Sequence, residues 1–502
     1  MDNIIIGKHT LESLTSGMYS DPYVIYREYI QNSVDSIDEA VHQGIINKGE
    51  ENITISLFPS EGRLSIMDNG VGVKKNDVEK VLISIGNSQK KIGMFRGFRG
   101  IGRLAGLSYC QRLVFRTSYC GEAISSTIEI DALKLSKLLA DNYEKDQTIV
   151  EVLSNIYSVE HEIEKKDNHY FEVELIGIDS NSNLLDLNSV RTYLEQSLPV
   201  PFSPDFVWGK EIRNRLALDN IVVDCYNVNL RHGLHTTAIY KPYKDTFLVD
   251  KGKQLYDRIK DIDIVSIKKP DESISAVGWI AQTSYLGSIA DKSVKGIRLR
   301  KGNILIGDYQ TLNVVFKDAR FNGWTIGEIH VQDDNLIPNA RRDNFEKNGA
   351  YFLLYEQIAN LAASLTKEIR AASLKRNTEA AKALEQSSKA SKAANKAIRN
   401  KVSDKQITEI TKELISAQDA LKKVATKNDS DRYNCEIAFE ELDMLIGKLK
   451  GVTKYKALNS IKGLTISEKR LLERVFDIIN ESSTKNSNKL IDTILYNIAE
   501  EK

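Results

Sequence analysis

Two short segments near the N-terminus, residues 53–58 and 63–68, alternate apolar and polar positions. The tetrapeptide Pro59-Ser60-Glu61-Gly62, which is rich in turn-forming residues, separates them. Alternation with a period of two is typical of half-buried strands, so this stretch predicts a β-hairpin. Further strand-like runs follow at residues 112–117, 126–130, 170–176, 221–228 and 296–306.

A helical pattern precedes the hairpin. Glu28, Asn32 and Asp35 are spaced to share one face of a helix, and the opposite face is apolar and can pack on a sheet. The apolar residues of that face are Ile30, Val34, Ile37 and Val41. Asp21 is a suitable cap and Pro22 a suitable first residue, so we expect the helix to begin there. The polar face is either an ordinary solvated face or a surface available to a ligand.

The composition changes beyond residue 350. All eight prolines lie at or before Pro338, and residues 351–502 contain 27 Lys plus Arg, 21 Asp plus Glu and only three glycines. This composition favours long helices. A softer boundary lies near residues 180–205, where prolines and small polar residues gather. We therefore predict an α+β protein with two mixed regions, 1–190 and 191–350, followed by a helical region.

The charge and the cysteine content bear on the class of partner and on the cellular compartment. The 502 residues include 69 Lys plus Arg and 69 Asp plus Glu, so overall charge does not favour a polyanionic partner. The four cysteines are scattered, as is typical of a reducing compartment. No run approaches 18 apolar residues, so we expect a cytoplasmic protein without membrane contact. Residues 366–405, however, contain 11 basic and four acidic residues, which suits a solvated helix, a coiled coil or a polyanion-binding surface.

Two glycine-containing segments carry candidate chemistry. Asp68-Asn69-Gly70-Val71-Gly72 follows the second strand of the hairpin, which places a carboxylate at a strand end before a turn. Taken alone, this is a common Asn-Gly turn. Residues 86–106 then contain six glycines together with Ser88, Lys90 and several other basic residues. Such a segment can surround phosphates with backbone N–H groups and positive charge.

The order of these three signals resembles the Bergerat-fold ATPases, the superfamily of gyrase, heat-shock chaperones, histidine kinases and MutL. The residues around Glu28 and Asn32 are most similar to the heat-shock protein 90 (HtpG-type) branch, over about residues 4–350. The resemblance implies an ATP-binding α/β sandwich in 1–190 with a lid at about 86–106, a transducer-like middle domain in 191–350, and a helical region in 351–502.

The resemblance also implies roles for individual residues. Glu28 would be the general base, Asn32 would coordinate Mg²⁺, and Asp68 would accept the amino group of adenine. Residues on the helix, the turn and the lid would hold ATP: Asn32, Asp35, Asp68, Gly70, Gly72, Ser88, Lys90, Gly97, Gly100, Ile101 and Gly102. One residue of the family pattern stays unassigned, because no Gly-Thr pair precedes the 170–176 strand.

A fourth motif lies at residues 333–343, where Arg341 and Arg342 follow a turn. Taken alone, this is a surface loop. It resembles the catalytic loop in the middle domain of the heat-shock chaperones, and residues 295–308 resemble the strand before that loop. The resemblance implies that Arg342, or its neighbour Arg341, reaches the γ-phosphate of ATP.

Two functions are compatible with these features. The first is an ATP-dependent, slowly hydrolysing machine that remodels protein clients, which we favour because of the 339–343 loop, and which forms a homodimer. The second is an ATP-gated clamp on nucleic acid, similar to MutL and MORC proteins, with residues 366–405 as its contact; the lid at 97–100 also resembles MutL. A histidine kinase is disfavoured, because no phosphoacceptor helix precedes the ATPase motifs.

Overall fold

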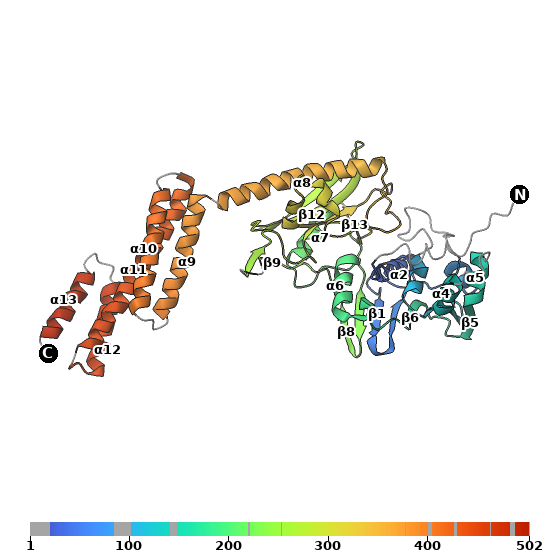
Figure 1. Cartoon of the computed structure of the whole chain (residues 1–502), viewed down its shortest axis with the longest axis horizontal. Helices are drawn as coiled ribbons and strands as arrows, with labels where there is room; N and C mark the ends of the chain where they lie inside the picture. The colour runs from blue at the N-terminus through green and yellow to red at the C-terminus, as the bar shows by residue number, and fades with distance from the viewer. Residues whose placement is uncertain are drawn as a thin grey trace. The chain divides into compact units, whose positions relative to one another are not determined.

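The computed structural model of this protein describes residues 21–84, 102–140, 148–218, 221–250, 252, 254–376, 378–399, 404–425, 429–461, 463–481 and 487–500. The chain divides into two compact units, Met1–Ile369 and Arg370–Lys502. The described part of the first unit mixes helices and sheets, and that of the second is helical, which confirms the α+β class (Figure 1). None of the described helices is long and apolar enough to cross a lipid bilayer.

An eight-stranded sheet forms the N-terminal part of the first unit. Its strand order is β5-β4-β3-β6-β2-β1-β7-β8, and only β1 and β7 run parallel. The strands are β1 (Ile53–Phe58), β2 (Arg63–Asp68), β3 (Arg112–Ser118), β4 (Ile124–Asp131), β5 (Tyr157–Ile163), β6 (Tyr170–Ile176), β7 (Val228–His232) and β8 (His235–Ala238). The predicted β1–β2 hairpin is confirmed, with Ile55 opposite Ile66. The last two strands come from the 191–350 region of the sequence.

The expected strand at residues 221–228 is wrong for all but its last position. Residues 221–227 have no regular structure, and β7 begins only at Val228. The apolar side chains of this segment belong to two different cores, since Tyr226 packs with the first sheet and Ile221 packs in the middle region. The apolar pattern therefore reflects a crossing between two cores, not one strand face.

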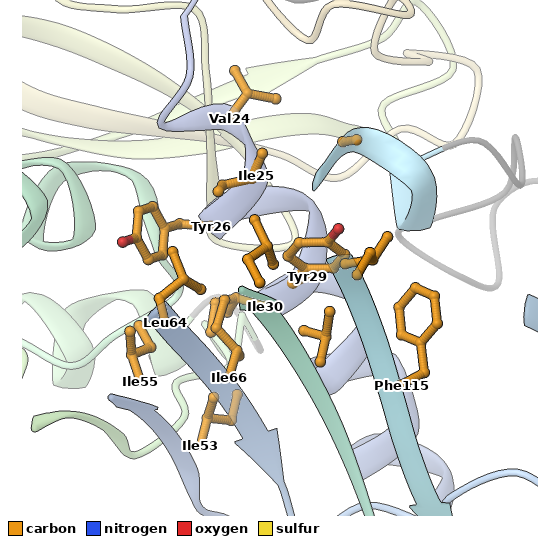
Figure 2. Packing of buried hydrophobic residues seen from close by; sticks show 14 of the residues in the cluster. Val24, Ile25, Tyr26, Tyr29, Ile30, Ile53, Ile55, Leu64, Ile66 and Phe115 are labelled. Carbon is orange, nitrogen blue, oxygen red and sulfur yellow. The ribbon is translucent and has the colours of Figure 1, made fainter. Parts of the chain in front are cut away.

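Helix α2 (Val24–His42) crosses one face of the sheet. Ile30, Val34 and Ile37 are completely buried. In Figure 2, the labelled side chains of α2 lie over those of β1 and β2, including Leu64 and Ile66. Each aliphatic side chain buried in this way contributes about 1.5–3 kcal/mol to folding. This apolar face fixes the rotation of α2 and hence the direction of its polar face.

The start of α2 differs from the prediction. The helix begins at Val24 instead of Pro22, and Asp21–Tyr23 form a turn before it. The Asp21 carboxylate accepts a hydrogen bond from Tyr23 N at 3.0 Å, so it closes this turn instead of capping the helix. The Tyr23 ring stacks on Tyr193, with 5.4 Å between ring centroids. This contact ties the entrance of α2 to α6 (Leu187–Ser197).

The other α-helices that the structure describes between residues 43 and 156 are short. They are α3 (Val78–Leu82), α4 (Ala132–Ala140) and α5 (Ile149–Ile156). A 3₁₀ helix, η3 (Gly102–Ser108), packs on α2. The Tyr29 hydroxyl bridges the two elements, because it donates to Arg103 O at 3.1 Å and accepts from Gly106 N at 3.0 Å.

The middle region has its own five-stranded sheet, in the order β11-β12-β15-β13-β14. Its strands are β11 (Asp261–Lys268), β12 (Ile274–Gln282), β13 (Gly296–Lys301), β14 (Ile304–Ile306) and β15 (Ile326–Val331), and a separate ribbon pairs β9 (Thr246–Asp250) with β10 (Leu255–Arg258). The expected strand at 296–306 is a hairpin, because Gly302 and Asn303 both adopt positive φ and turn the chain. Helices α7 (Trp208–Leu218) and α8 (Gly349–Arg376) complete the region.

The second unit contains long helices in its described residues. These are α9 (Glu379–Arg399), α10 (Asp404–Ala425), α11 (Asp429–Ser460), α12 (Ile466–Glu481) and α13 (Ser487–Glu500). The first three helices pack together through small and aliphatic side chains such as Ala394, Leu414 and Leu442. α12 and α13 share a smaller core around Phe476 and Ile491. The division between the units falls within α8, whereas the sequence pattern places it at residue 350, where that helix begins.

Candidate active site

A mostly buried ion pair joins α2 to the loop that follows β15. Arg342 Nε lies 3.2 Å from Glu28 Oε1, and only 12% and 9% of the two side chains are exposed. Opposite charges attract more strongly where water is largely excluded. The structure therefore brings into contact two residues that the sequence proposes as catalytic from separate motifs.

Arg27 is a third member of this contact, and the sequence motifs did not identify it. Its guanidinium lies 3.5 Å from Glu28 Oε1 and donates a hydrogen bond to the backbone oxygen of Arg341 at 3.1 Å. Arg27 is buried. Adjacent residues on a helix point in different directions, so the sequence does not indicate that Arg27 and Glu28 contact the same loop. The packing of the loop onto α2 brings Arg341 O to Arg27 and the Arg342 side chain to Glu28.

The loop holds Arg342 in an uncommon backbone conformation. Its φ of 56° lies in the left-handed region, which costs a non-glycine residue about 1–2 kcal/mol. Two backbone hydrogen bonds stabilise it: Arg342 N donates to Asn339 O at 3.0 Å, and Gly307 N donates to Arg342 O at 2.9 Å. The neighbouring Arg341 is exposed. Of the two candidate arginines, Arg342 is therefore the one whose side chain faces α2.

Asp68 lies at the end of β2, in the middle of the sheet. It is 2% exposed, and its Oδ1 accepts a hydrogen bond from Gly70 N at 2.9 Å. Asp68 pairs with Phe171 of β6, which in turn pairs with Thr117 of β3. Residues opposite each other in a sheet share a face, so these three side chains form one row across the strands.

Thr117 is a buried hydroxyl that the sequence analysis did not single out. Its Oγ1 accepts from Val73 N at 2.9 Å and donates to Tyr170 O at 3.0 Å. The family pattern in the sequence has a threonine directly before β6, whereas Thr117 belongs to the neighbouring strand β3. Only the strand order places Thr117 in the same row as Asp68, and no local motif indicates it.

The glycines after Asp68 are required by close packing. A Cβ added to Gly70 would lie 2.2 Å from the Oγ of Ser36 on α2. A Cβ added to Gly72 would lie 2.0 Å from the backbone oxygen of Ser118, and Gly72 also has a φ of +72°. The turn is therefore pressed between α2 and β3, which locates the Asp68 end of the site beside Ser36.

Gly102 is the one lid candidate for phosphate contact within the described residues. A Cβ at this position would lie 2.5 Å from Glu28 Oε2, so the start of η3 touches the carboxylate. The other lid candidates, Ser88, Lys90, Gly97, Gly100 and Ile101, lie outside the described residues.

Asn32 and Asp35 follow Glu28 along the polar side of α2. Asp35 is buried, and Asn32 is partly exposed. Within the part of the chain that the structure describes, the Asn32 amide makes no side-chain hydrogen bond to the protein. An amide oxygen in this position is available to a ligand or a cation.

A sequence profile of the family described as histidine kinase-, DNA gyrase B-, and HSP90-like ATPase matches residues 20–162. This stretch includes Glu28, Asn32, Asp68 and the lid. Residues 20–162 are therefore similar to an ATPase domain of this type. The ion pair with Arg342 thus connects the ATPase domain to the middle region.

The chain is also similar in sequence to chaperone proteins. The chaperone protein HtpG of Alcanivorax borkumensis is 24% identical over 155 residues, which are 27% of this chain and 25% of that protein. HtpG of Buchnera aphidicola subsp. Schizaphis graminum is 34% identical over 90 residues, or 17% of this chain and 14% of the relative. HtpG of Geobacter metallireducens is 36% identical over 87 residues, or 16% and 13%. The chain thus aligns with a quarter or less of the length of these relatives.

Proposed function

We propose that this protein binds ATP with Mg²⁺ and hydrolyses it slowly to ADP and phosphate. The observation that carries the proposal is the contact of Glu28 with both Arg342 and the start of η3, inside an ATPase domain. A carboxylate beside a glycine-bounded segment and a guanidinium provides a proton acceptor and a phosphate-binding cation at one point.

The ends of the proposed nucleotide site are separated along α2. Asp68 and its turn pack at Ser36, whereas η3 and Arg342 meet the helix at Glu28. At 1.5 Å of rise per residue, these two positions are about 12 Å apart along the helix axis. An elongated ligand that contacts both would lie along α2, with its base at Asp68 and its phosphates at Glu28.

Glu28 is proposed as the general base and Arg342 as the residue that stabilises charge on the γ-phosphate. In the ion pair, Arg342 occupies one oxygen of the Glu28 carboxylate. A phosphate carries more negative charge than one carboxylate, so bound ATP would draw the Arg342 guanidinium away from Glu28. Glu28 is then released to orient water and accept its proton.

The residues present fit a Mg²⁺ ion that is held mainly by the nucleotide. Magnesium in such sites takes one or two protein ligands and completes its coordination with phosphate oxygens and water. Asn32, one helical turn from Glu28, supplies a partly exposed amide oxygen of the required kind. When bound, the ion would neutralise phosphate charge during transfer to water.

We propose further that the ATPase cycle remodels protein partners and that the protein acts as a homodimer. The named HtpG relatives support a chaperone-like role. The helices of the second unit provide a surface for association, because large apolar side chains such as Leu471 and Ile478 of α12 are exposed. Isolated exposed apolar groups are ordinary, but two on one helix face favour a contact surface.

One observation favours the nucleic-acid clamp as a second candidate. Lys389, Lys392 and Lys396 are exposed on α9, spaced so that they share one face, while alanines such as Ala390 and Ala394 line the buried face. A row of lysines on one helix face suits a phosphate backbone. Its ordinary alternative is a solvated helix surface, since Lys389 also pairs with Glu385 at 2.7 Å.

Turnover and nucleotide binding, measured separately, test the proposed ATPase. With Mg²⁺ present, we expect Glu28→Ala to bind ATP normally but to lose at least about 100-fold in turnover, because the base acts on water. Glu39→Ala, on the same helix, is the matched control and should hydrolyse ATP as the wild type does. Calorimetric titration and phosphate release give the two quantities. Wild-type turnover by Glu28→Ala would reject Glu28 as the base, and absence of ATP binding by the wild type would reject the function.

A further inference from the structure

A second cluster of buried charges lies in the middle region, away from the residues of the proposed ATP site. Glu328 of β15 is completely buried, with Arg300 Nε 2.5 Å from its Oε1 and Lys241 Nζ 2.5 Å from its Oε2. The Tyr243 hydroxyl donates to Oε1 at 3.0 Å, and His330 Nε2 lies 3.2 Å from Oε2. We refer to Glu328, Arg300, Lys241, Tyr243 and His330 as the Glu328 cluster.

Such a cluster is costly to bury. Each ion loses several kcal/mol of hydration in a protein interior, and its partners repay this only when the geometry is good. Burial and, to a smaller extent, the nearby Arg300 cation lower the pKa of Lys241 to about 8. Burial likewise lowers the pKa of His330 to about 4, so the ring is neutral near pH 7. An apolar core would fill this space at less cost, which suggests a role that needs directed bonds.

Arg300 extends the cluster to the end of α6. Its Nη2 donates to Gln196 O at 2.7 Å, and its Nη1 lies 3.4 Å from Leu198 O and 2.9 Å from Asn303 O. The last carbonyls of a helix have no partner within the helix and carry partial negative charge. The Arg300 guanidinium therefore binds the C-terminus of α6 and the Glu328 carboxylate at the same time.

The other side of α6 meets the ATPase domain. Tyr193, one turn before the helix end, stacks on Tyr23 at the entrance of α2. α6 contacts α2 directly and contacts β14 of the middle sheet as well. Figure 1 shows α6 beside α2. α6 thus connects the middle sheet to the helix that carries Glu28.

Glu328 is also connected to the arginine loop through its own strand. β15 ends at Val331, and the chain continues directly into the loop with Arg342. Glu328 therefore belongs to the strand that leads to Arg342. Through Arg300 its carboxylate is also linked to α6, which contacts α2, the helix that carries Glu28. A shift of the middle sheet relative to α6 would change the separation of the two catalytic candidates.

We infer that the Glu328 cluster is the joint that positions Arg342 against Glu28, with Arg300 as its central positioning residue. This inference rests on the proposed ATPase function for its catalytic consequence. Its structural consequence, the ordering of the 337–346 loop, does not depend on ATP. The two can therefore be measured independently.

Arg300→Lys is the decisive variant. Lysine keeps the charge beside Glu328 but lacks the fork that also reaches Gln196 and Leu198. Arg298→Lys is the matched control, because Arg298 is equally buried on the same strand and face, yet its guanidinium donates hydrogen bonds to Lys292 O and Ser293 O within the middle region. Both variants lose similar packing, and only the first loses the link to α6.

We expect Arg300→Lys to lower kcat about tenfold while the Kd for ATP changes by less than about twofold, because misplacement of a catalytic group affects turnover more than binding. We expect Arg298→Lys to leave both quantities close to wild type. Equal kcat for wild type and Arg300→Lys, or an equal loss in both variants, would overturn the inference.

Hydrogen exchange of the full chain without nucleotide provides the second readout. Amides of residues 337–346 should exchange about tenfold faster in Arg300→Lys than in wild type or Arg298→Lys, with β1 and β2 unchanged. Unchanged protection in that loop would reject the positioning role of the Glu328 cluster even if turnover fell. A wild type without ATPase activity would reject the proposed function alone, since this exchange measurement still decides the inference. If Arg300→Lys does not fold, Tyr193→Leu removes the contact between α6 and the entrance of α2 and should give the same two changes.

Discussion

Arg342 Nε lies 3.2 Å from Glu28 Oε1, so the proposed γ-phosphate ligand holds the proposed general base. Arg27 lies 3.5 Å from the same carboxylate oxygen. Both guanidinium groups thus contact the same oxygen of the carboxylate that is proposed to act on water. The arrangement therefore represents a resting contact that must open before water is activated.

Replacing Arg342 should separate turnover from binding. We expect Arg342→Ala to lower kcat by at least about 100-fold with little change in the affinity for ATP, because its charge is needed mainly in the transition state. Arg341→Ala is the control: Arg341 contacts Arg27 through its backbone oxygen, which the substitution keeps. Steady-state kinetics and nucleotide titration test this. Loss of activity only in Arg341→Ala would move the role to that residue, and full activity in both would remove the loop from the site.

Gly102 provides a steric test of the same site. An alanine Cβ would lie 2.5 Å from Glu28 Oε2, too close without displacing the carboxylate. We expect Gly102→Ala to reduce kcat at least about tenfold. Gly349→Ala, where a Cβ has no atom within 4 Å, should have wild-type kinetics. If both variants turn over ATP equally, the position of the Glu28 carboxylate is not critical.

The sequence predicts the parts of the site that local patterns determine. The spacing of Glu28 and Asn32, the β1–β2 hairpin and Asp68 at its end all depend on residues close in the chain. The predicted start of α2 at Pro22 is wrong because Asp21 closes a turn at Tyr23. The same sequence is compatible with an aspartate that caps a helix and with one that closes a turn. Contacts of Arg27 and Thr117 depend on how distant segments pack, which no local pattern contains.

The Glu328 cluster contains buried charges that the sequence pattern does not predict. Arg298 and Arg300 alternate with Ile297 and Leu299, a pattern that ordinarily indicates a strand with one solvated face. Both arginines are nevertheless buried. Their burial is possible because partners such as Glu328 come from other strands, and the sequence gives no sign of that pairing. Alternation along a strand therefore does not show that its charged positions are exposed.

The neutral His330 in this cluster predicts a loss of stability in acid. Its pKa is lowered from 6.5 to about 4 by burial, with the cations Lys241 and Arg300 acting in the same direction and Glu328 opposing them. Between these values the unfolded chain binds the proton more readily than the folded one, so stability falls as pH falls from about 6.5 to about 4. The contribution is roughly 3 kcal/mol.

Urea unfolding on either side of this pH window measures the effect. We expect His330→Gln, which cannot take up the proton, to lose less stability on acidification than the wild type. His235→Gln, at an exposed position, should behave as the wild type does. Identical acid sensitivity in wild type and His330→Gln would show that other groups cause the loss.

The last prediction separates a protein client from nucleic acid. If α9 binds a phosphate backbone, Lys389, Lys392 and Lys396 release counterions on binding, and affinity must fall steeply as salt rises. We favour a protein client, because the named relatives are chaperones and the total charge is balanced. We therefore expect weak DNA and RNA binding at physiological salt and no stimulation of ATP turnover by either.

Replacing those three lysines with glutamate makes the test specific. For a protein client, the variant should keep the wild-type ATPase rate in the presence and absence of nucleic acid. The matched control places the same charge change on exposed lysines of the first unit, Lys165, Lys166 and Lys210. Fluorescence anisotropy across a salt series and phosphate release are the measurements. Steep salt-dependent binding that stimulates turnover, and that disappears only in the α9 variant, would establish the nucleic-acid clamp instead, because a loss confined to one helix face cannot come from net charge alone.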